Sequence, residues 1–198
     1  MAIEIELKAY LDDYAPVKER LSVWGDYCRS YKKSDSYWLP VQPAAGMTVP
    51  GVRVRRESGI DADGAAHETV WATCKIKEIS GGIEVNNESE FTVSDAGLFE
   101  ALLGRLGLLR AVCKEKEGWA WTIPPQTAGQ SPIVAEISLV AGLGWFLEIE
   151  IMAADDRAPT VQESRKRLFA LLEKLEIPAD RIESRPYTAM LQEKQEVF

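Results

Sequence analysis

The chain has very little histidine and cysteine. Among its 198 residues there are one histidine, His67, and three cysteines, Cys28, Cys74 and Cys113. A hydrolase triad needs a histidine beside its nucleophile, and a zinc site needs clustered cysteine or histidine, so the sequence indicates neither. An odd number of distant cysteines argues against a disulfide framework and predicts a reducing, cytoplasmic setting. We expect all three cysteines to be small buried apolar residues.

The chain also lacks long apolar runs and an excess of positive charge. No stretch approaches the ~20 apolar residues of a membrane-spanning helix, and no secretory signal opens the chain. The net charge is −8 and the pI is about 4.9, which argues against general binding to nucleic acid or anionic membranes. We therefore expect neither nucleic acid nor membrane as a partner. The hydrophobic fraction of 46% is ample for a core.

Strands dominate the predicted secondary structure. Alternating apolar and polar residues predict strands at 3–8, 27–39, 52–57, 69–79, 83–93, 109–123, 133–140 and 145–152. Helices are predicted from Pro16 to Gly25, at 94–107, at 160–175 behind a Thr160–Glu163 capping box, and near 187–195. This order predicts an α+β fold: an eight-stranded antiparallel, tunnel-like barrel with helices packed on the outside. No composition break marks a second domain, so residues 1–198 are expected to form a single domain.

Charged residues recur at every second position of most predicted strands. A solvated sheet face is the common explanation for any one such strand. The set as a whole is unusual because the charges are sorted by strand. The cationic pairs are Arg53/Arg55, Lys75/Lys77 and Lys114/Lys116, and the acidic pairs are Glu4/Glu6, Glu88/Glu90 and Glu148/Glu150. Since helices need the apolar face of the sheet, closing the sheet would place these charges inside.

A barrel lined with charge implies a charged ligand, because burying unpaired ions costs several kcal/mol each. Arginine and lysine at this density suit polyphosphate oxygens. Paired carboxylates on adjoining strands suit a hard cation, Mg²⁺ or Mn²⁺. The residues therefore indicate a wet interior for polyphosphate and metal, as in phosphoryl chemistry.

The sequence resembles the CYTH superfamily, the triphosphate tunnel metalloenzymes, which include class IV adenylyl cyclases and thiamine triphosphatases. "EIELK" is similar to the E-x-E-x-K signature, and "VRVRRE", "ATCKIKE" and "VCKEKEGW" resemble the basic strands that follow. "DSYWLP" and "NNESEF" resemble the D-x-Y-x-x-P and E-x-E segments, and "GLGWFLEIEI" closely matches G-L-G-x-F-x-E-I-E. "RPYTAML" is similar to the tail of the class IV cyclases. The similarity covers nearly the whole chain in the family's order.

The resemblance implies a divalent-metal enzyme with a nucleoside or inorganic triphosphate as substrate. Carried over by position, the implied phosphate-binding residues are Arg53, Arg55, Lys75, Lys77, Lys114 and Lys116. The implied metal ligands are Glu4, Glu6, Glu136, Glu148 and Glu150, with Glu88 and Glu90 as supporting acidic residues. Lys8 and Lys75 are the candidate catalytic residues. A homodimer is one of the open oligomeric states.

Three positions depart from the family pattern. Ser138 stands where the family usually has aspartate, and Glu136 on the same face is the candidate to replace it. Lys116 stands where arginine is more usual, and Asn86 or Asn87 where arginine often precedes the acidic segment. Three functions remain open: a class IV type adenylyl cyclase, which the tail favours; a triphosphatase for inorganic, thiamine or nucleoside triphosphate; and a non-catalytic polyphosphate-binding module.

Overall fold

A computed structural model describes residues 2–41, 51–80, 83–155 and 157–195 of the chain, and the side chains of 75–88 lie outside that description. The described strands are β1 (Ala2–Leu11), β2 (Asp26–Pro40), β3 (Val52–Asp61), β4 (Ala66–Ser80), β5 (Ile83–Thr92), β6 (Leu108–Ile123), β7 (Ile133–Val140) and β8 (Gly144–Ala153). The described helices are α1 (Ala15–Trp24), α2 (Ala96–Arg105), α3 (Ala158–Lys174) and α4 (Tyr187–Gln195), with a 3₁₀ turn, η1, at Ala179–Arg181.

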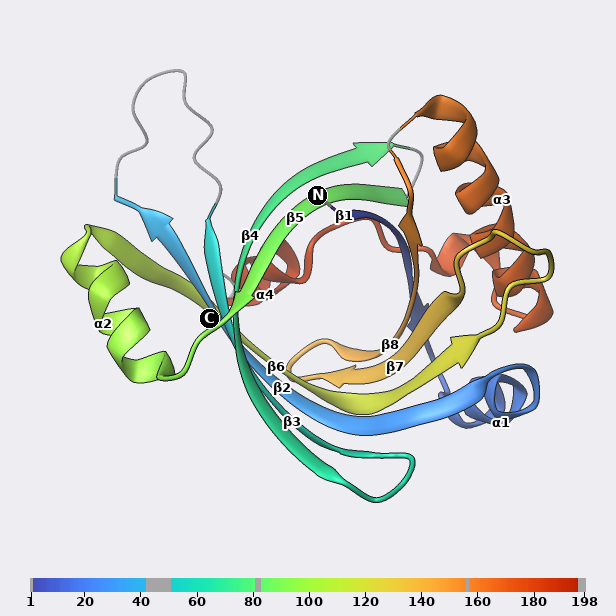
Figure 1. Ribbon diagram of the computed structural model, residues 1–198, viewed down its shortest axis with the longest axis horizontal. Helices are drawn as coiled ribbons and strands as arrows, with labels where there is room; N and C mark the ends of the chain where they lie inside the picture. Colours follow the sequence, from blue (N-terminus) through green and yellow to red (C-terminus); the bar gives the residue numbers. More distant parts are fainter. Residues whose placement is uncertain (1, 42–50, 81–82, 156, 196–198) are drawn as a thin grey trace.

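The strands form a closed antiparallel barrel. Their order around the barrel is β1-β5-β4-β3-β2-β6-β7-β8, and β8 pairs with β1 to complete the ring. Figure 1 looks along the opening that this ring surrounds. The predicted α+β barrel is therefore confirmed, and closure leaves no free edge among these strands.

The main hydrophobic core lies outside the barrel wall. Ile3, Ile5 and Leu7 of β1 are buried against residues of α1 and α3, including Leu21 and Leu168. Side chains alternate across a strand, so the intervening Glu4, Glu6 and Lys8 must point to the other side of the wall. Because the helices cover the outer, apolar face of the sheet, the charged face lines the interior of the barrel, as the alternation predicts.

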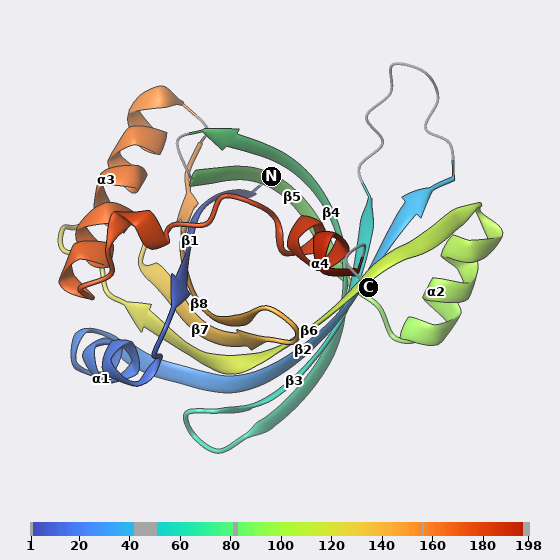
Figure 2. The same cartoon turned by 180° about the vertical axis from the view of Figure 1, so that it is seen from behind.

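The remaining two helices occupy different places. A smaller core joins α2 to β3 through Ala96, Leu103 and Val54, on the side of the barrel away from α1 and α3 (Figure 1). The last helix, α4, lies at the mouth of the barrel that faces the viewer in Figure 2. Tyr187 at its start packs against Phe146 and lines the interior cavity. This helix therefore contributes to the tunnel as well as covering it.

Several local expectations were tested. Asp95 caps α2 by accepting from the backbone N–H of Leu98 at 2.9 Å. The capping box at Thr160 was wrong: α3 begins two residues earlier, after Arg157, where Pro159 fits the first helical turn. The expectation of buried cysteines was wrong: Cys28 and Cys74 are only half-buried, and Cys113 is exposed on β6. None of the helices in the described ranges is long and apolar enough to cross a membrane.

Candidate functional site

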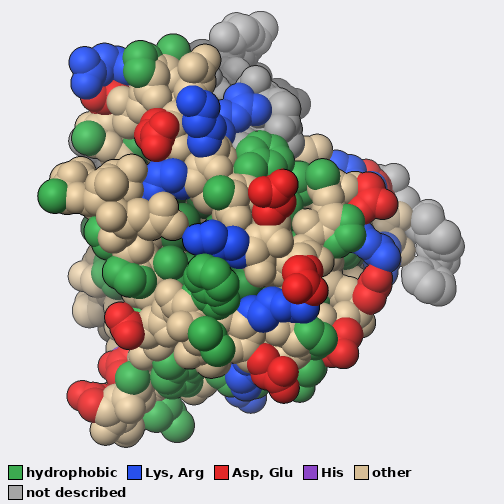
Figure 3. Space-filling view, turned by 90° about the vertical axis from the view of Figure 1, so that its right-hand side faces the viewer, with side chains coloured by type: hydrophobic (Ala, Val, Ile, Leu, Met, Phe, Trp, Pro, Cys, Tyr) green, Lys and Arg blue, Asp and Glu red, His purple; other side chains and the backbone are tan. Residues whose placement is uncertain are grey.

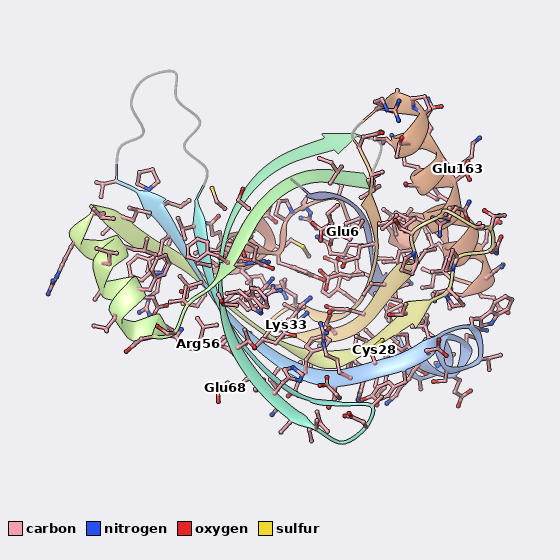
Figure 4. All side chains as sticks on the ribbon, viewed as in Figure 1. Glu6, Cys28, Lys33, Arg56, Glu68 and Glu163 are labelled. Carbon is pink, nitrogen blue, oxygen red and sulfur yellow. The ribbon has the colours of Figure 1, made fainter. Side chains whose placement is uncertain are left out.

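A cavity of about 920 Å³ runs through the barrel. Charged or polar side chains from all eight strands reach it, because the lumen-facing positions share one parity on each strand. In Figure 4, Glu6 and Lys33 lie within the ring of strands, whereas Glu68 and Glu163 lie outside it. The lining includes Glu4, Glu6, Lys8, Lys33, Arg53, Arg55, Glu57, Glu90, Lys114, Lys116, Glu136, Glu148 and Glu150.

Asp35 is the centre of the first ion-pair network. It lies on β2 opposite Arg55 of β3 and Lys114 of β6, so strand register brings all three together. Arg55 donates to both carboxylate oxygens at 2.7 and 2.9 Å, and the Lys114 Nζ lies 3.0 Å from Oδ2. Burial raises the pKa of Asp35, but Lys114 and Arg55 together hold it well below its usual value. The carboxylate therefore stays ionised and fixes two cations in the lumen.

A second network centres on Lys116. Its Nζ lies 3.0 Å from Glu136 and 2.5 Å from Glu148, on the two neighbouring strands β7 and β8. Glu136 also pairs with Lys33 at 2.6 Å. Burial opposes the charge on each group, yet the opposite charges win: the pKa of Lys116 is raised, and that of Glu148 falls to about 2.

Lys33 is the exception within this network. Burial lowers its pKa to about 8, although Glu136 opposes the shift. The side chain is 4% exposed, and its Nζ lies 4.1 Å from the centre of the Tyr31 ring. The Tyr31 hydroxyl in turn bonds to Ser138 at 3.1 Å, and Ser138 donates to Glu148. Ser138, where the resemblance implies an aspartate, therefore joins Tyr31 to the Lys116 network.

Three carboxylates form what we call the acidic wall: Glu4 and Glu6 of β1 and Glu150 of β8, across the barrel from Asp35 on β2. Glu6 of β1 lies opposite Glu150 of β8 in the strand register, and Glu4 is hydrogen bonded to Glu150. Burial raises the pKa of Glu150 well above its usual value, and the charges on Glu4, Glu136 and Glu6 raise it further. Like charges gathered this closely favour either a shared proton or a cation.

Arg53 and Lys8 mark two further parts of the lumen. Arg53 donates to Thr73 at 2.9 Å and to Glu90 at 3.2 Å, which ties β3 to β4 and β5. Lys8 donates to the backbone oxygen of Arg185 at 2.6 Å, and its Nζ lies 4.3 Å from the centre of the Tyr187 ring. Lys8 therefore joins β1 to the segment that enters α4.

The structure brings most of the residues named from sequence to one cavity. These are the cations Lys8, Arg53, Arg55, Lys114 and Lys116 and the acids Glu4, Glu6, Glu90, Glu136, Glu148 and Glu150. The side chains of Lys75, Lys77 and Glu88 lie outside the described residues, although Lys75 and Glu88 are register partners on β4 and β5.

Sequence reasoning missed several lumen residues, among them Lys33, Glu57 and Tyr187, and the buried Asp35 that pairs with lumen cations. Asp35 and Lys33 share the lumen parity of β2, but that strand mixes the two signs of charge instead of repeating one. Asp35 could have been found from "DSYWLP", whose aspartate lies opposite Arg55 once β2 and β3 are paired. Sorting charges by strand alone was therefore too coarse a criterion.

A family model for the CYTH domain matches residues 2–187 of the chain. The chain belongs to the CYTH family. No curated protein matches the sequence. Among solved structures, the CYTH fold here is similar to PH1819 of Pyrococcus horikoshii OT3, with 24% identity, a TM-score of 0.78, and coverage of 96% of this chain and 99% of that one.

Two other CYTH-like structures carry functional descriptions. A candidate adenylate cyclase from Vibrio parahaemolyticus is 16% identical, with a TM-score of 0.73 and coverage of 96% of this chain and 98% of that one. HpAC1 of Hippeastrum, described as having a dominant triphosphatase activity, is 13% identical, with a TM-score of 0.56 and coverage of 93% and 91%. At these identities the similarity shows a shared fold.

The acidic wall fits the divalent metal on which CYTH tunnel enzymes depend. Within the described ranges, no three carboxylates converge on a single ion site. Glu4 and Glu150 are nevertheless close enough to share a hydrogen bond. Mg²⁺ characteristically takes one or two carboxylates and completes its shell with water and substrate phosphates. A pair of carboxylates in the same lumen as a cationic wall, which Arg53, Arg55, Lys114 and Lys116 form, suits that mode of binding.

Proposed function

We propose that this CYTH protein is a divalent-metal-dependent enzyme that converts ATP to cyclic AMP and pyrophosphate, a class IV type adenylyl cyclase. The observation that carries the proposal is the division of one tunnel into a cationic and an acidic wall. A triphosphate brings several negative charges and needs both cations and a metal to offset them. The cavity of about 920 Å³ also leaves room for a nucleoside beside the phosphates.

The cationic wall is proposed to bind the phosphates. Arg53, Arg55, Lys114 and Lys116 would donate to phosphate oxygens, with Lys75 and Lys77 of β4 as further candidates. Asp35 holds Arg55 and Lys114 in place before substrate arrives, which reduces the loss of side-chain freedom on binding. Glu136 and Glu148 would orient Lys116 in the same way. The family resemblance instead implies that these two residues bind the metal.

The acidic wall is proposed to hold the metal through Glu4 and Glu150, with Glu6 beside them and Glu90 supporting Arg53. The metal, Mg²⁺ or Mn²⁺, would stabilise negative charge that develops on the phosphates during the reaction. In the cyclase reaction the ribose 3′-oxygen attacks the α-phosphate and pyrophosphate leaves. Lys8 and Lys75 are the proposed catalytic residues, and Tyr187, from the cyclase-like tail, lies in the lumen beside Lys8.

Triphosphate hydrolysis is the second candidate. It needs the same phosphate-binding cations and the same metal, with water attacking the terminal phosphate. The triphosphatase activity described for HpAC1 supports it, as that protein shares the fold over most of both chains. The replacement of the family aspartate by Ser138 is compatible with either reaction and leaves a non-catalytic binding module as a third outcome.

Incubation of the purified protein with Mg²⁺ or Mn²⁺ and ATP, with separation of the products, distinguishes these functions. Cyclic AMP with pyrophosphate is the expected result. ADP with phosphate, or faster cleavage of inorganic triphosphate, would replace the cyclase by the phosphatase. Binding of ATP measured by calorimetry with no turnover would leave only the binding module.

A further inference from the structure

Helix α2 is apolar on faces that no described element covers. Of its ten residues, only Glu100 and Arg105 are charged. Glu100 points back to the barrel, where it accepts from Arg56 at 2.7 Å and from Ser36 at 2.5 Å. Arg105 is therefore the one charged side chain that α2 itself offers to solvent. A surface helix normally carries polar residues on its outer face, and a helix that is apolar all round is normally buried.

The exposed side of α2 carries a row of leucines at helical spacing. Leu98, Leu102 and Leu106 are 72%, 48% and 67% exposed. Residues four apart lie above one another on a helix, so the three form a continuous stripe. Phe91 of β5, which contacts Phe99 of α2 edge to face at 6.0 Å, and Leu109 of β6 are also more than half exposed. We call these five residues the α2 patch.

Other helices of the same molecule show the usual pattern. On α3, Glu163, Lys166, Glu173 and Lys174 face solvent. The molecular face that includes α1 and α3 intersperses cationic and anionic side chains with apolar ones (Figure 3). Val23 on α1 is 83% exposed but belongs to a helix with several charged residues. Contiguous apolar surface of the α2 kind marks interaction sites, whereas single exposed apolar residues are ordinary.

We propose that the α2 patch is a dimer interface occupied by a second copy of this chain, with the two α2 helices antiparallel about a twofold axis near Leu102. An isologous interface must be self-complementary. A row of leucines centred on Leu102 meets this condition, because Leu98 of one copy then lies beside Leu106 of the other.

The charges flanking α2 are complementary under the same symmetry. Exposed Asp95 precedes the helix, and exposed Arg105 and Arg110 lie at and beyond its other end. The twofold axis brings the acidic end of each helix to the basic end of the other, and the helix dipoles also oppose one another favourably. A parallel arrangement would place like charges together. A foreign partner would not require this internal symmetry.

The size of the patch sets the expected strength of the dimer. A helix of ten residues is roughly 15 Å long, which is short for an interface of about 800 Å² per partner. Phe91 and Leu109 must therefore contribute as well. We expect a dimer whose dissociation depends measurably on protein concentration.

The test is the mass of the full chain in solution, measured by light scattering and sedimentation over a wide range of concentration. We expect a concentration-dependent dimer that Leu102→Lys shifts to monomer, with the dissociation constant raised at least about tenfold. Val23→Lys, an equally drastic change at an exposed position on α1, is expected to leave the dimer intact. Since both positions are exposed, circular dichroism should show that both variants fold.

Arg105→Glu adds an independent measurement. It leaves the leucines in place but sets acidic groups against Asp95 of the other copy, so the dimer should weaken and the effect should shrink in high salt. A wild-type protein that is monomeric at every concentration overturns the proposal. A dimer that Leu102→Lys leaves unchanged overturns the assignment to α2. Neither result depends on the enzymatic activity.

Discussion

The two walls of the tunnel solve the problem of buried charge in different ways. On the cationic wall, each of the described groups Asp35, Glu136 and Glu148 is paired with a lysine or arginine within 3.0 Å. On the acidic wall, Glu4, Glu6 and Glu150 lie together, and burial, followed by the charges of the other carboxylates, raises the pKa of Glu150. The first arrangement holds cations in fixed positions in the lumen. In the second, like charges repel one another, and a bound cation would relieve this repulsion, which is why we propose it as the metal site.

Glu150→Gln is expected to have the largest effect on activity. The change keeps the shape of the side chain but removes a proposed metal ligand, so activity should fall on the order of 10²- to 10³-fold or more. Turnover at saturating Mn²⁺ measures this. Glu117→Gln, on the outward-facing side of β6, is the matched control and should retain activity. Wild-type turnover of Glu150→Gln would remove Glu150 from the metal site.

Glu150→Gln is expected to raise the stability of the metal-free protein, although it lowers activity. The folded-state pKa of Glu150 lies above its value in the unfolded chain, so the folded state binds its proton more tightly. Metal-free wild-type protein should therefore lose stability as pH rises from about 4.5 through the folded-state pKa. Glu150→Gln removes this loss, and its advantage in urea denaturation should grow with pH. A variant that is less stable at neutral pH would show that Glu150 is structural instead.

Asp35→Ala tests the other wall. It leaves Arg55 and Lys114 buried without their common counter-ion, and breaking a buried pair in this way costs about 3–5 kcal/mol. The wild-type pKa of Asp35 is lowered, so its contribution is present at neutral pH and is lost as pH falls towards the folded-state pKa. Urea denaturation at neutral and acid pH measures both effects.

A rescue experiment tests whether the cations around Asp35 bind phosphate or only form structural salt bridges. If Arg55 and Lys114 bind phosphate, added inorganic triphosphate should stabilise Asp35→Ala more than wild type, because it replaces the missing negative charge. An equal shift in the melting temperature of the two proteins would count against a phosphate role for this wall.

Much of this contrast could be read from the sequence, because it depends on parity. Glu4, Glu6, Arg53, Arg55, Glu148 and Glu150 each lie two residues from a like-charged neighbour, and a strand places such pairs on one side. Closure of the sheet followed from the helices, which need the apolar side. These local patterns were enough for the fold and for most of the tunnel lining.

The pairings within the tunnel were out of reach because they depend on register between distant strands. Lys33 and Asp35 lie two residues apart on β2, yet Lys33 pairs with Glu136 of β7 and Asp35 pairs with Arg55 of β3. Of the five proposed metal ligands, Glu136 and Glu148 pair with Lys116, whereas Glu4, Glu6 and Glu150 lie together. This division likewise depends on how the barrel closes. The choice between cyclase and phosphatase depends on where the attacking oxygen is held, which no pattern of charge describes.

Arg55→Ala should have a smaller effect than Asp35→Ala. Asp35 keeps Lys114 as a partner, so the fold should be retained. The loss of forked contacts to phosphate should weaken triphosphate binding by about 1.5–3 kcal/mol. Calorimetric titration with a non-hydrolysable triphosphate measures the change. An unchanged affinity would confine Arg55 to a structural role.

The smallest and most specific effect is expected at the junction of the two walls, from Tyr187→Phe. The Tyr187 hydroxyl is buried with no hydrogen-bond partner among the described residues, so removing it should leave stability level or slightly higher. Its ring, between Lys8 and Lys114, is retained by phenylalanine. If the hydroxyl contacts the nucleoside, KM for ATP should rise several-fold while cleavage of inorganic triphosphate stays unchanged, because only ATP carries a nucleoside.

Equal effects of Tyr187→Phe on both substrates would place the hydroxyl at the phosphates, and no effect on either would limit Tyr187 to holding the two lysines. Comparing the two substrates in one variant therefore tests whether the α4 end of the tunnel receives the part of the substrate that makes it a nucleotide.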